Sequence, residues 1–139
     1  MAKTISAIQA LISNKISSIT DIKFVSNYGD GNFSAYPAAV IIPTGGIGKV
    51  ADTAVHERIF NFEVLLYQEQ SLQATSKEDA ELKMVQVCDQ IIQEFDQDQD
   101  LGKEVMRVEV VDYTFDFKAQ SGTWNFATFR VNAVVLVNH

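Results

Sequence analysis

The stretch VHERIFNFEVLLYQ, residues 55–68, decides the fold of this chain. Its even-numbered positions from 60 to 66 all carry large apolar side chains, whereas its odd-numbered positions are mixed. Alternation with a period of two is typical of a β-strand whose two faces meet different surroundings. At about 3.3 Å per residue this strand is about 40–45 Å long, so we predict that its first residues protrude as an arm.

Two shorter strands and a glycine-rich segment precede the long strand. Residues 22–26 contain β-branched side chains, and residues 36–43 contain the apolar run Ala-Ala-Val-Ile-Ile, so both segments are predicted strands. Such a run is typical of a strand covered on both faces, and proline is tolerated at strand ends such as Pro37 and Pro43. Residues 44–53 contain three glycines and are predicted to form a loop.

Two amphipathic helices flank these strands. The first is predicted at residues 4–19, with an apolar stripe of Ile5, Ile8, Ile12, Ile16 and Ile19. Its opposite face is polar and nearly uncharged, and consists of Ser6, Gln9, Ser13, Asn14 and Ser17.

The second helix is predicted to run from the capping box Thr75-x-x-Glu78 to Phe95 or Asp96. Its apolar stripe consists of Ala80, Met84, Val87, Cys88, Ile91 and Phe95, widened by Val85 and Ile92. Leu82 falls outside this stripe and is predicted to be exposed.

Two further strands are predicted at residues 105–117 and 124–137, joined by a hairpin loop at 118–123. The apolar residues of the first change phase, and we predict a β-bulge near Val110 that brings both phases to one face. The aromatic residues of this hairpin are predicted to pack in the core, with Trp124 or Phe126 at an interface.

The resulting element order, α-β-β-β-α-β-β, predicts an α+β fold. We expect a single domain, residues 1–139, in which two helices pack on a mainly antiparallel mixed sheet of about five strands.

The composition is that of an ordinary globular chain, with 139 residues, 47% of them hydrophobic, and a formal charge of −7. This acidity argues against a protein that grips nucleic acid through phosphates, because such binding needs clustered lysine and arginine. The single cysteine, Cys88, excludes an intramolecular disulfide, and no apolar run is long enough to cross a bilayer. The N-terminus lacks the apolar core of a signal peptide, so we expect a reducing, aqueous compartment.

Two motifs that resemble ligand sites fail in detail. Residues 44–49 lack the first glycine and the hydroxyl residue of a phosphate-binding loop, and a strand rather than a helix follows them. Residues 96–100 match the first ligand positions of a calcium loop, but Leu101 replaces the turn glycine and Arg107 replaces the bidentate glutamate.

The nucleophilic and metal-ligating residues are few. Cys88 is predicted to be a small buried hydrophobe rather than a nucleophile. His56 and His139 have no ligand or catalytic partner at a suitable spacing. We therefore predict no catalytic residue, no cofactor, no metal site and no enzymatic activity.

Three segments carry a family resemblance. They are the aromatic-Pro-aliphatic strand Tyr-Pro-Ala-Ala-Val-Ile-Ile at 36–42, the long strand that opens Arg-Ile-Phe-Asn-Phe-Glu-Val at 58–64, and the single long helix at 76–95. With an amphipathic helix before them and two strands after them, they resemble the tail terminator, or tail-completion, proteins of long-tailed bacteriophages over nearly the whole chain.

This resemblance implies a structural virion protein. Such proteins form a ring, usually a hexamer, on the head-proximal end of the tail tube, where the ring stops tube polymerisation and presents a joining surface to the head connector. The implied partners are further copies of the chain, the tail tube protein and the neck proteins, while DNA passes through the lumen without specific binding. The implied location is the neck region of the virion, after assembly in the cytoplasm of the bacterial host, with no membrane involved.

An interface in such a ring requires extended surface without a dense charge barrier. The candidates are the uncharged face of the first helix and the following residues: Gly45, Gly46, Ile47, Gly48, Lys49, Val55, His56, Arg58, Leu82, Gln120, Ser121, Gly122 and Trp124. Two other readings stay open: a different neck or minor tail component, such as a head-completion protein, and a small ligand-binding α+β domain of the host.

Overall fold

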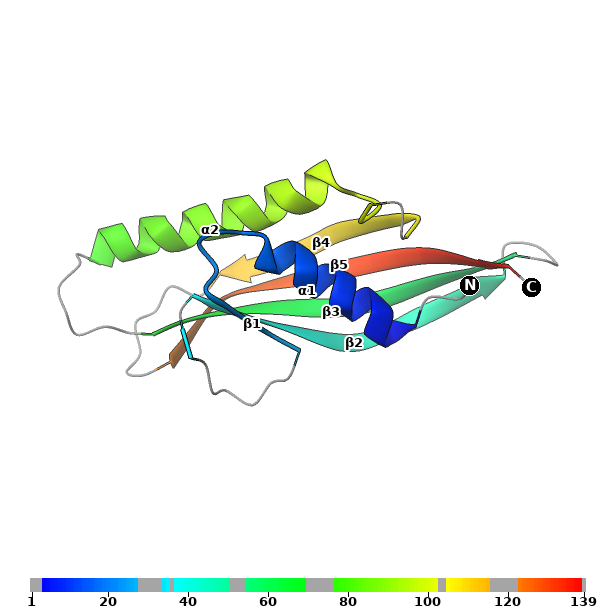
Figure 1. The fold of residues 1–139 in the computed structure, drawn as a ribbon, viewed down its shortest axis with the longest axis horizontal. Coiled ribbons are helices and arrows are strands. Elements are labelled where there is room, and N and C mark those ends of the chain that lie inside the picture. The colour runs from blue at the N-terminus through cyan, green and yellow to red at the C-terminus, as the bar shows by residue number, and fades with distance from the viewer. Residues whose placement is uncertain are drawn as a thin grey trace.

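Two helices and a five-stranded mixed sheet make up the computed structural model (Figure 1). It describes residues 4–27, 34–35, 37–50, 55–69, 77–102, 105–115 and 123–138. The elements in chain order are α1 (Ile5–Ser17), β1 (Phe24–Ser26), β2 (Ala38–Val50), β3 (Val55–Glu69), α2 (Lys77–Gln97), β4 (Arg107–Phe115) and β5 (Thr123–Asn138). The predicted α+β class and the predicted order of elements are confirmed.

The sheet has the strand order β1-β2-β3-β5-β4. β1 runs parallel to β2, and all the other neighbours are antiparallel. β3 lies at the centre and pairs with β5 over its whole length, from Val55 opposite Asn138 to Glu69 opposite Thr123. The long alternating stretch at residues 55–68 is therefore the central strand of the sheet.

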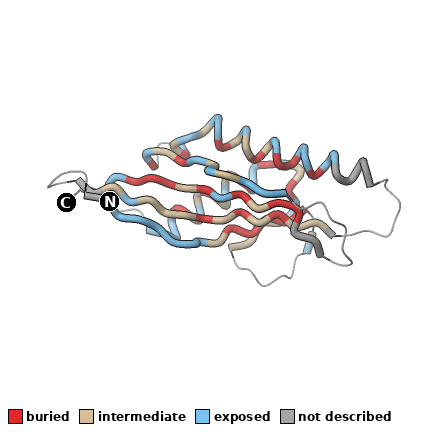
Figure 2. Tube along the Cα trace, turned by 180° about the vertical axis from the view of Figure 1, so that it is seen from behind, coloured by how far each residue is buried: buried red, intermediate tan, exposed pale blue. Residues whose placement is uncertain are grey.

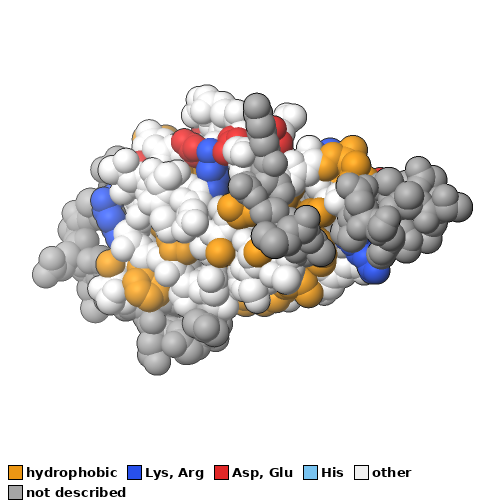
Figure 3. Space-filling view, turned by 45° about the vertical axis from the view of Figure 1, so that its right-hand side comes forward, with side chains coloured by type: hydrophobic (Ala, Val, Ile, Leu, Met, Phe, Trp, Pro, Cys, Tyr) orange, Lys and Arg blue, Asp and Glu red, His pale blue; other side chains and the backbone are white. Residues whose placement is uncertain are grey.

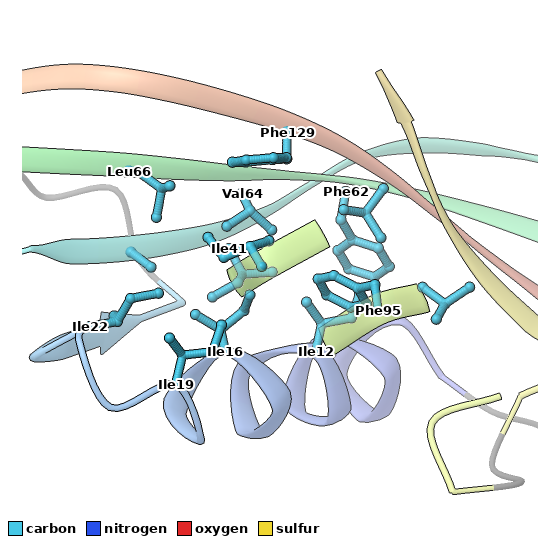
Figure 4. Packing of buried hydrophobic residues seen from close by; sticks show 14 of the residues in the cluster. Ile12, Ile16, Ile19, Ile22, Ile41, Phe62, Val64, Leu66, Phe95 and Phe129 are labelled. Carbon is cyan, nitrogen blue, oxygen red and sulfur yellow. The ribbon is translucent and has the colours of Figure 1, made fainter. Parts of the chain in front are cut away.

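Both helices lie on one face of this sheet, where α1 packs on β1 and β2 and α2 packs on β4 (Figure 1). The core fills the space between the layers (Figure 4). Its fully buried large side chains include Ile12, Ile16, Ile41, Phe62, Val64, Leu66, Phe95 and Phe129. Each such side chain stabilises the fold by about 1.5–3 kcal/mol relative to an exposed one, which explains why the apolar stripes dictate the architecture.

The predicted first helix is confirmed, including its start. Thr4 is the N-cap, and its hydroxyl oxygen accepts a hydrogen bond from the backbone N–H of Ala7 at 3.1 Å. Ile8, Ile12 and Ile16 are completely buried, whereas Ile5 is exposed because it lies in the first turn.

The glycine-rich segment is not a loop, so that prediction is wrong for residues 44–50. β2 continues through all three glycines to Val50, and each of them pairs with a residue of β3. Pro43 accordingly lies inside the strand, next to an irregularity between Pro43 and Gly45 where the register shifts. Gly45 has a φ of +141°, which only glycine adopts without strain.

The predicted arm also takes a different form. The first residues of β3 do not protrude alone, because Lys49 and Val50 of β2 pair with them on one side and the end of β5 pairs with them on the other. The hydrogen-bond ladder to β3 compensates for the weak strand propensity of the glycines in β2.

The predicted bulge near Val110 is confirmed. Val110 pairs with Val131, but the next pair joins Asp112 to Arg130, so Val111 is the extra residue. Tyr113 therefore returns to the face of Val110.

The predictions for the second helix and the last hairpin are only partly confirmed. α2 begins at Lys77, so the capping residue Thr75 lies outside the described residues, as does most of the predicted hairpin loop. Ile92 packs partly against the core, whereas Val85 is exposed and does not widen the apolar stripe. Phe126 is completely buried and so belongs to the core, not to an interface. The prediction that the hairpin aromatics pack in the core is wrong for Tyr113 and Phe115, which are exposed near the end of β4. Neither helix in the described ranges is long and apolar enough to cross a membrane.

Candidate functional site

One end of the sheet extends beyond α1, and we call it the distal end (Figure 1). It consists of residues 45–50 of β2, 55–61 of β3 and 132–138 of β5. Most of the interface residues predicted from sequence meet here: Gly45, Gly46, Ile47, Gly48, Lys49, Val55, His56 and Arg58. Two segments that the sequence suggested separately, a glycine stretch and the start of a long strand, are thus one surface.

The distal end combines exposed backbone with a few exposed side chains. Ile47 is 56% exposed, and Leu136 on β5 is 46% exposed. Arg58 is also exposed, and its guanidinium lies against the backbone of Gly48, since a methyl group on Gly48 would be 2.5 Å from Nη1 of Arg58. The side chains of Lys49, Val55 and His56 are outside the described set.

The remaining predicted interface residues do not join this surface. Leu82 is 57% exposed, as predicted, but it lies in the N-terminal half of α2, near the opposite end of the molecule (Figure 1). Trp124 pairs with Gln68 at that same opposite end, and its side chain is not described. Gln120, Ser121 and Gly122 lie outside the described residues.

The polar face of α1 is only partly available for an interface. The side-chain amide of Gln9 donates to the carbonyl oxygen of Ile41 at 2.8 Å, and the Ser13 hydroxyl donates to the Asn27 side chain. Both polar groups therefore hold the helix to the rest of the fold. Ser6, Asn14 and Ser17 remain exposed.

The helix-free face of the sheet carries a shallow concavity of about 470 Å³ that the sequence analysis missed. Its polar lining includes Glu63, Asp112, Arg130 and Asn132. Nε of Arg130 donates to Asp112 at 2.5 Å, and this hydrogen bond lowers the pKa of Asp112. Arg130 alternates with apolar residues in the sequence, but only the pairing of β4 with β5 places Asp112 opposite it.

A second ionic cluster joins the helices. Nζ of Lys15 lies 3.0 Å from Asp98 and 3.4 Å from Glu94. Partial burial lowers the pKa of Lys15, but hydrogen bonds and attraction from the two carboxylates outweigh this effect and raise it. The pKa of Asp98 is lowered, first by a hydrogen bond from the backbone N–H of Gly102 and then by Lys15. Part of the acidic stretch at 96–100 thus serves to fasten α1 to α2.

Cys88 is almost completely buried, as predicted. Burial, together with the nearby charge of Asp89, raises the pKa of its thiol to about 12. A thiol that stays protonated is a poor nucleophile and a poor metal ligand. Within the described ranges, no group of three or more His, Cys, Asp or Glu side chains is arranged to hold a metal ion.

The net charge of the protein is concentrated in one segment. Residues 77–102, which comprise α2 and the turn after it, contain two lysines against eight acidic residues. This segment alone carries −6 of the total charge of −7, so the rest of the chain is nearly neutral. In Figure 3 the visible acidic side chains gather near the top of the molecule, where α2 lies, while hydrophobic side chains reach the surface below.

No protein-family model matches the chain, and no curated protein matches it in sequence.

Proposed function

We propose that this chain is a tail terminator of a long-tailed bacteriophage. In this proposal several copies, most simply a hexamer, form a ring that caps the head-proximal end of the tail tube. The ring stops tube polymerisation and offers a joining surface to the head connector. The fold supports the proposal, because two helices on one face of a five-stranded mixed sheet match the element order of the sequence resemblance.

The observation that carries the proposal is the distal end. Three strands extend together beyond α1, with exposed glycine backbone, the exposed Ile47 and the exposed guanidinium of Arg58. Natural proteins usually cover or charge the exposed edge strand of a sheet, such as this part of β2, because such a strand associates with other chains. A surface of this kind suits a protein whose role is to dock, and we assign the ends of β3 and β5, together with the guanidinium of Arg58, to the contact with the tail tube.

The charge distribution is compatible with a ring around DNA. Because residues 77–102 carry most of the negative charge, the nearly neutral remainder is free to form protein interfaces without strong like-charge repulsion. An acidic α2 that faces the lumen repels phosphates, so DNA passes without being held.

The concavity on the helix-free face gives little support to a ligand-binding domain. Its most prominent charged groups, Asp112 and Arg130, are paired with each other instead of converging on an empty site. The proposal therefore includes no catalytic residue and no cofactor.

The test is electron microscopy of the protein mixed with a polymerising tail-tube protein from the same genome. We expect tubes of arrested length with a ring at one end. The variant Arg58→Glu should reduce the fraction of capped tubes several-fold, whereas Lys23→Glu should not, although it makes the same change in charge at an exposed site away from the distal end. Tubes of unlimited length without end density would refute the terminator role and direct attention to portal-side neck proteins.

A further inference from the structure

One lateral edge of the sheet is formed by β2, and over most of its length no strand among the described residues pairs with its outer side. β1 covers only the beginning, where Phe24, Val25 and Ser26 pair with residues 38–40. At the next position, the side-chain amide of Gln9 donates a hydrogen bond to the carbonyl oxygen of Ile41. From residue 42 to residue 50 no described strand pairs with β2 on that side, and this part of β2 forms the margin of the sheet (Figures 1 and 2). Such an edge presents a row of backbone donors and acceptors to any strand that approaches.

The other lateral edge is formed by β4, whose outer side pairs with no described strand, while α2 packs on one face of β4. Its beginning is closed by the turn after α2, since the backbone N–H of Val108 donates to the carbonyl oxygen of Gln99 at 2.5 Å. From residue 109 to residue 115 no strand in the described part of the chain lies beside β4 on its outer side. This stretch also exposes apolar side chains, including Val111 at 51% and Tyr113 at 47%. A neighbouring strand would cover apolar surface here as well as pair with the backbone.

The strand directions at the two edges allow antiparallel pairing between copies. β2 is antiparallel to β3, β3 to β5, and β5 to β4, so β2 and β4 run in opposite directions. A second copy placed beside the first in the same orientation, and shifted along the strand direction so that its β4 clears β1, therefore brings its β4 antiparallel to β2. The antiparallel pattern of the sheet then continues from one molecule into the next.

Charge favours this pairing over the pairing of two β2 edges. β2 contains Lys49 and no acidic residue, and the guanidinium of Arg58 lies against it. β4 contains two acidic residues, Glu109 and Asp112, against one arginine. Two β2 edges would bring like charges together, whereas the two acidic residues of β4 are balanced by Arg107 and Arg130, so β2 meets β4 without like-charge repulsion.

We propose that copies of this chain associate head to tail, with residues 42–50 of β2 in one copy forming an antiparallel ladder with residues 109–115 of β4 in the next. Contacts of this kind use two different surfaces and close into a ring when the rotation between copies allows it. This inference rests on the proposed ring, because it names the surfaces that join the ring's subunits.

Disulfide trapping between singly substituted variants tests the proposal. Ile47 and Glu109 lie on the helix-free face, as does Thr114, whereas Tyr113 lies on the helix-covered face. The Ile47→Cys variant is mixed under mild oxidation with Glu109→Cys, Thr114→Cys or Tyr113→Cys, both in solution and on capped tubes. All four positions are exposed or nearly half exposed, so each variant should fold, which circular dichroism checks. The native Cys88 stays buried and does not interfere.

The proposal predicts a mixed disulfide between Ile47→Cys and at least one of Glu109→Cys and Thr114→Cys, and none with Tyr113→Cys. Leu136→Cys is the matched control, since this residue is exposed on the same face but lies on β5, which has a strand on each side. It should form no disulfide with Glu109→Cys.

Three results would overturn the proposal: disulfide dimers of Ile47→Cys alone, cross-linking to Tyr113→Cys as strong as to the helix-free face, or no mixed disulfide under any condition. Capped tubes without the mixed disulfide would reject the edge pairing while leaving the terminator role intact. The mixed disulfide without tube capping would establish the edge pairing and reject the terminator role.

Discussion

Gly46 and Gly48 look alike in the sequence, but their surroundings in the sheet differ. A methyl group on Gly46 would lie 2.5 Å from the carbonyl oxygen of Ile59, a backbone atom held by the β2–β3 ladder. A methyl group on Gly48 would lie equally close to Nη1 of Arg58, but this atom ends a flexible side chain that can move away. Of these two glycines, only Gly46 is required by the fold.

We therefore expect Gly46→Ala to lower the free energy of unfolding by roughly 1–3 kcal/mol, as overpacking does. Gly48→Ala should change it by about 0.5 kcal/mol or less, as substitutions at exposed sites usually do. Urea unfolding of the two variants measures both values. Equal losses would contradict the distinction between a fixed and a movable neighbour.

Lys15 provides a second test at the level of single residues, because it bridges α1 to both Glu94 and Asp98. Replacing it by methionine keeps the apolar stem but removes the charge. We expect Lys15→Met to lower the free energy of unfolding at neutral pH by about 1 kcal/mol, the upper range for an accessible ion pair. Thermal unfolding followed by circular dichroism gives the difference.

The pH dependence of this difference follows from the two pKa shifts. The pKa of Asp98 is lowered from 3.8, so its contribution to stability is present above that value and is lost as the pH falls through the lower pKa of the folded state. The pKa of Lys15 is raised from 10.5, so its contribution is present below that value and is lost as the pH rises through the higher pKa of the folded state. The gap between wild type and Lys15→Met should therefore narrow in acid and in strong alkali. If the difference in free energy of unfolding between wild type and Lys15→Met is constant with pH, lost packing and not lost charge causes the destabilisation.

At the scale of elements, α2 presents a hydrophobic residue to solvent. Because Leu82 is 57% exposed, Leu82→Glu should leave the folded monomer as stable as the wild type to within about 0.5 kcal/mol. We expect the same change to weaken assembly, which electron microscopy of capped tubes measures; unchanged assembly would place this part of α2 outside every interface. The control is Val87→Glu, which places a charge in the core, since Val87 is completely buried, and should unfold the protein.

The helices and most strands could be predicted from sequence because each buries a periodic apolar surface, as Ile8, Ile12 and Ile16 do in α1. The bulge near Val110 could be predicted for the same reason, since only an extra residue reconciles the two phases of β4. The continuation of β2 through its glycines could not be predicted from sequence. Its stability comes from hydrogen bonds to β3, and a local pattern does not reveal a partner strand.

The candidate surface was predictable to a similar degree. Exposed residues such as Leu82 follow from a helical pattern alone. The register between strands decides that Gly48 pairs with Arg58 and that Asp112 pairs with Arg130. Gln9 looked available for a partner, but its amide is used by the carbonyl oxygen of Ile41 inside the molecule. Sequence spacing indicates which side chains share a face, and the fold decides which of them are already engaged.

At the scale of the whole molecule, the uneven charge predicts how assembly responds to salt. A ring places the acidic segment 77–102 of every copy at an equivalent position, so the segments repel one another, and added salt screens this repulsion. We expect the assembled fraction, measured by sedimentation velocity, to rise with sodium chloride concentration. The double variant Asp89→Asn, Asp96→Asn should show a weaker dependence on salt, because it removes two exposed charges from α2. Assembly that weakens with salt would mean that attraction between charges holds the copies together.

The position of β5 has a consequence for how the protein is made. β5 follows β4 in the sequence, yet in the sheet it lies between β3 and β4. On the ribosome, β2 and β3 emerge early and can form a hairpin, but β4 emerges with no strand of this sheet to pair with. The sheet is completed only after residue 138 has left the exit tunnel, when β5 inserts and brings together residues as distant in sequence as Val55 and Asn138. Contacts at such long range slow folding, so we expect the partly synthesised chain to expose an unfinished sheet for longer than a helical protein of this size would.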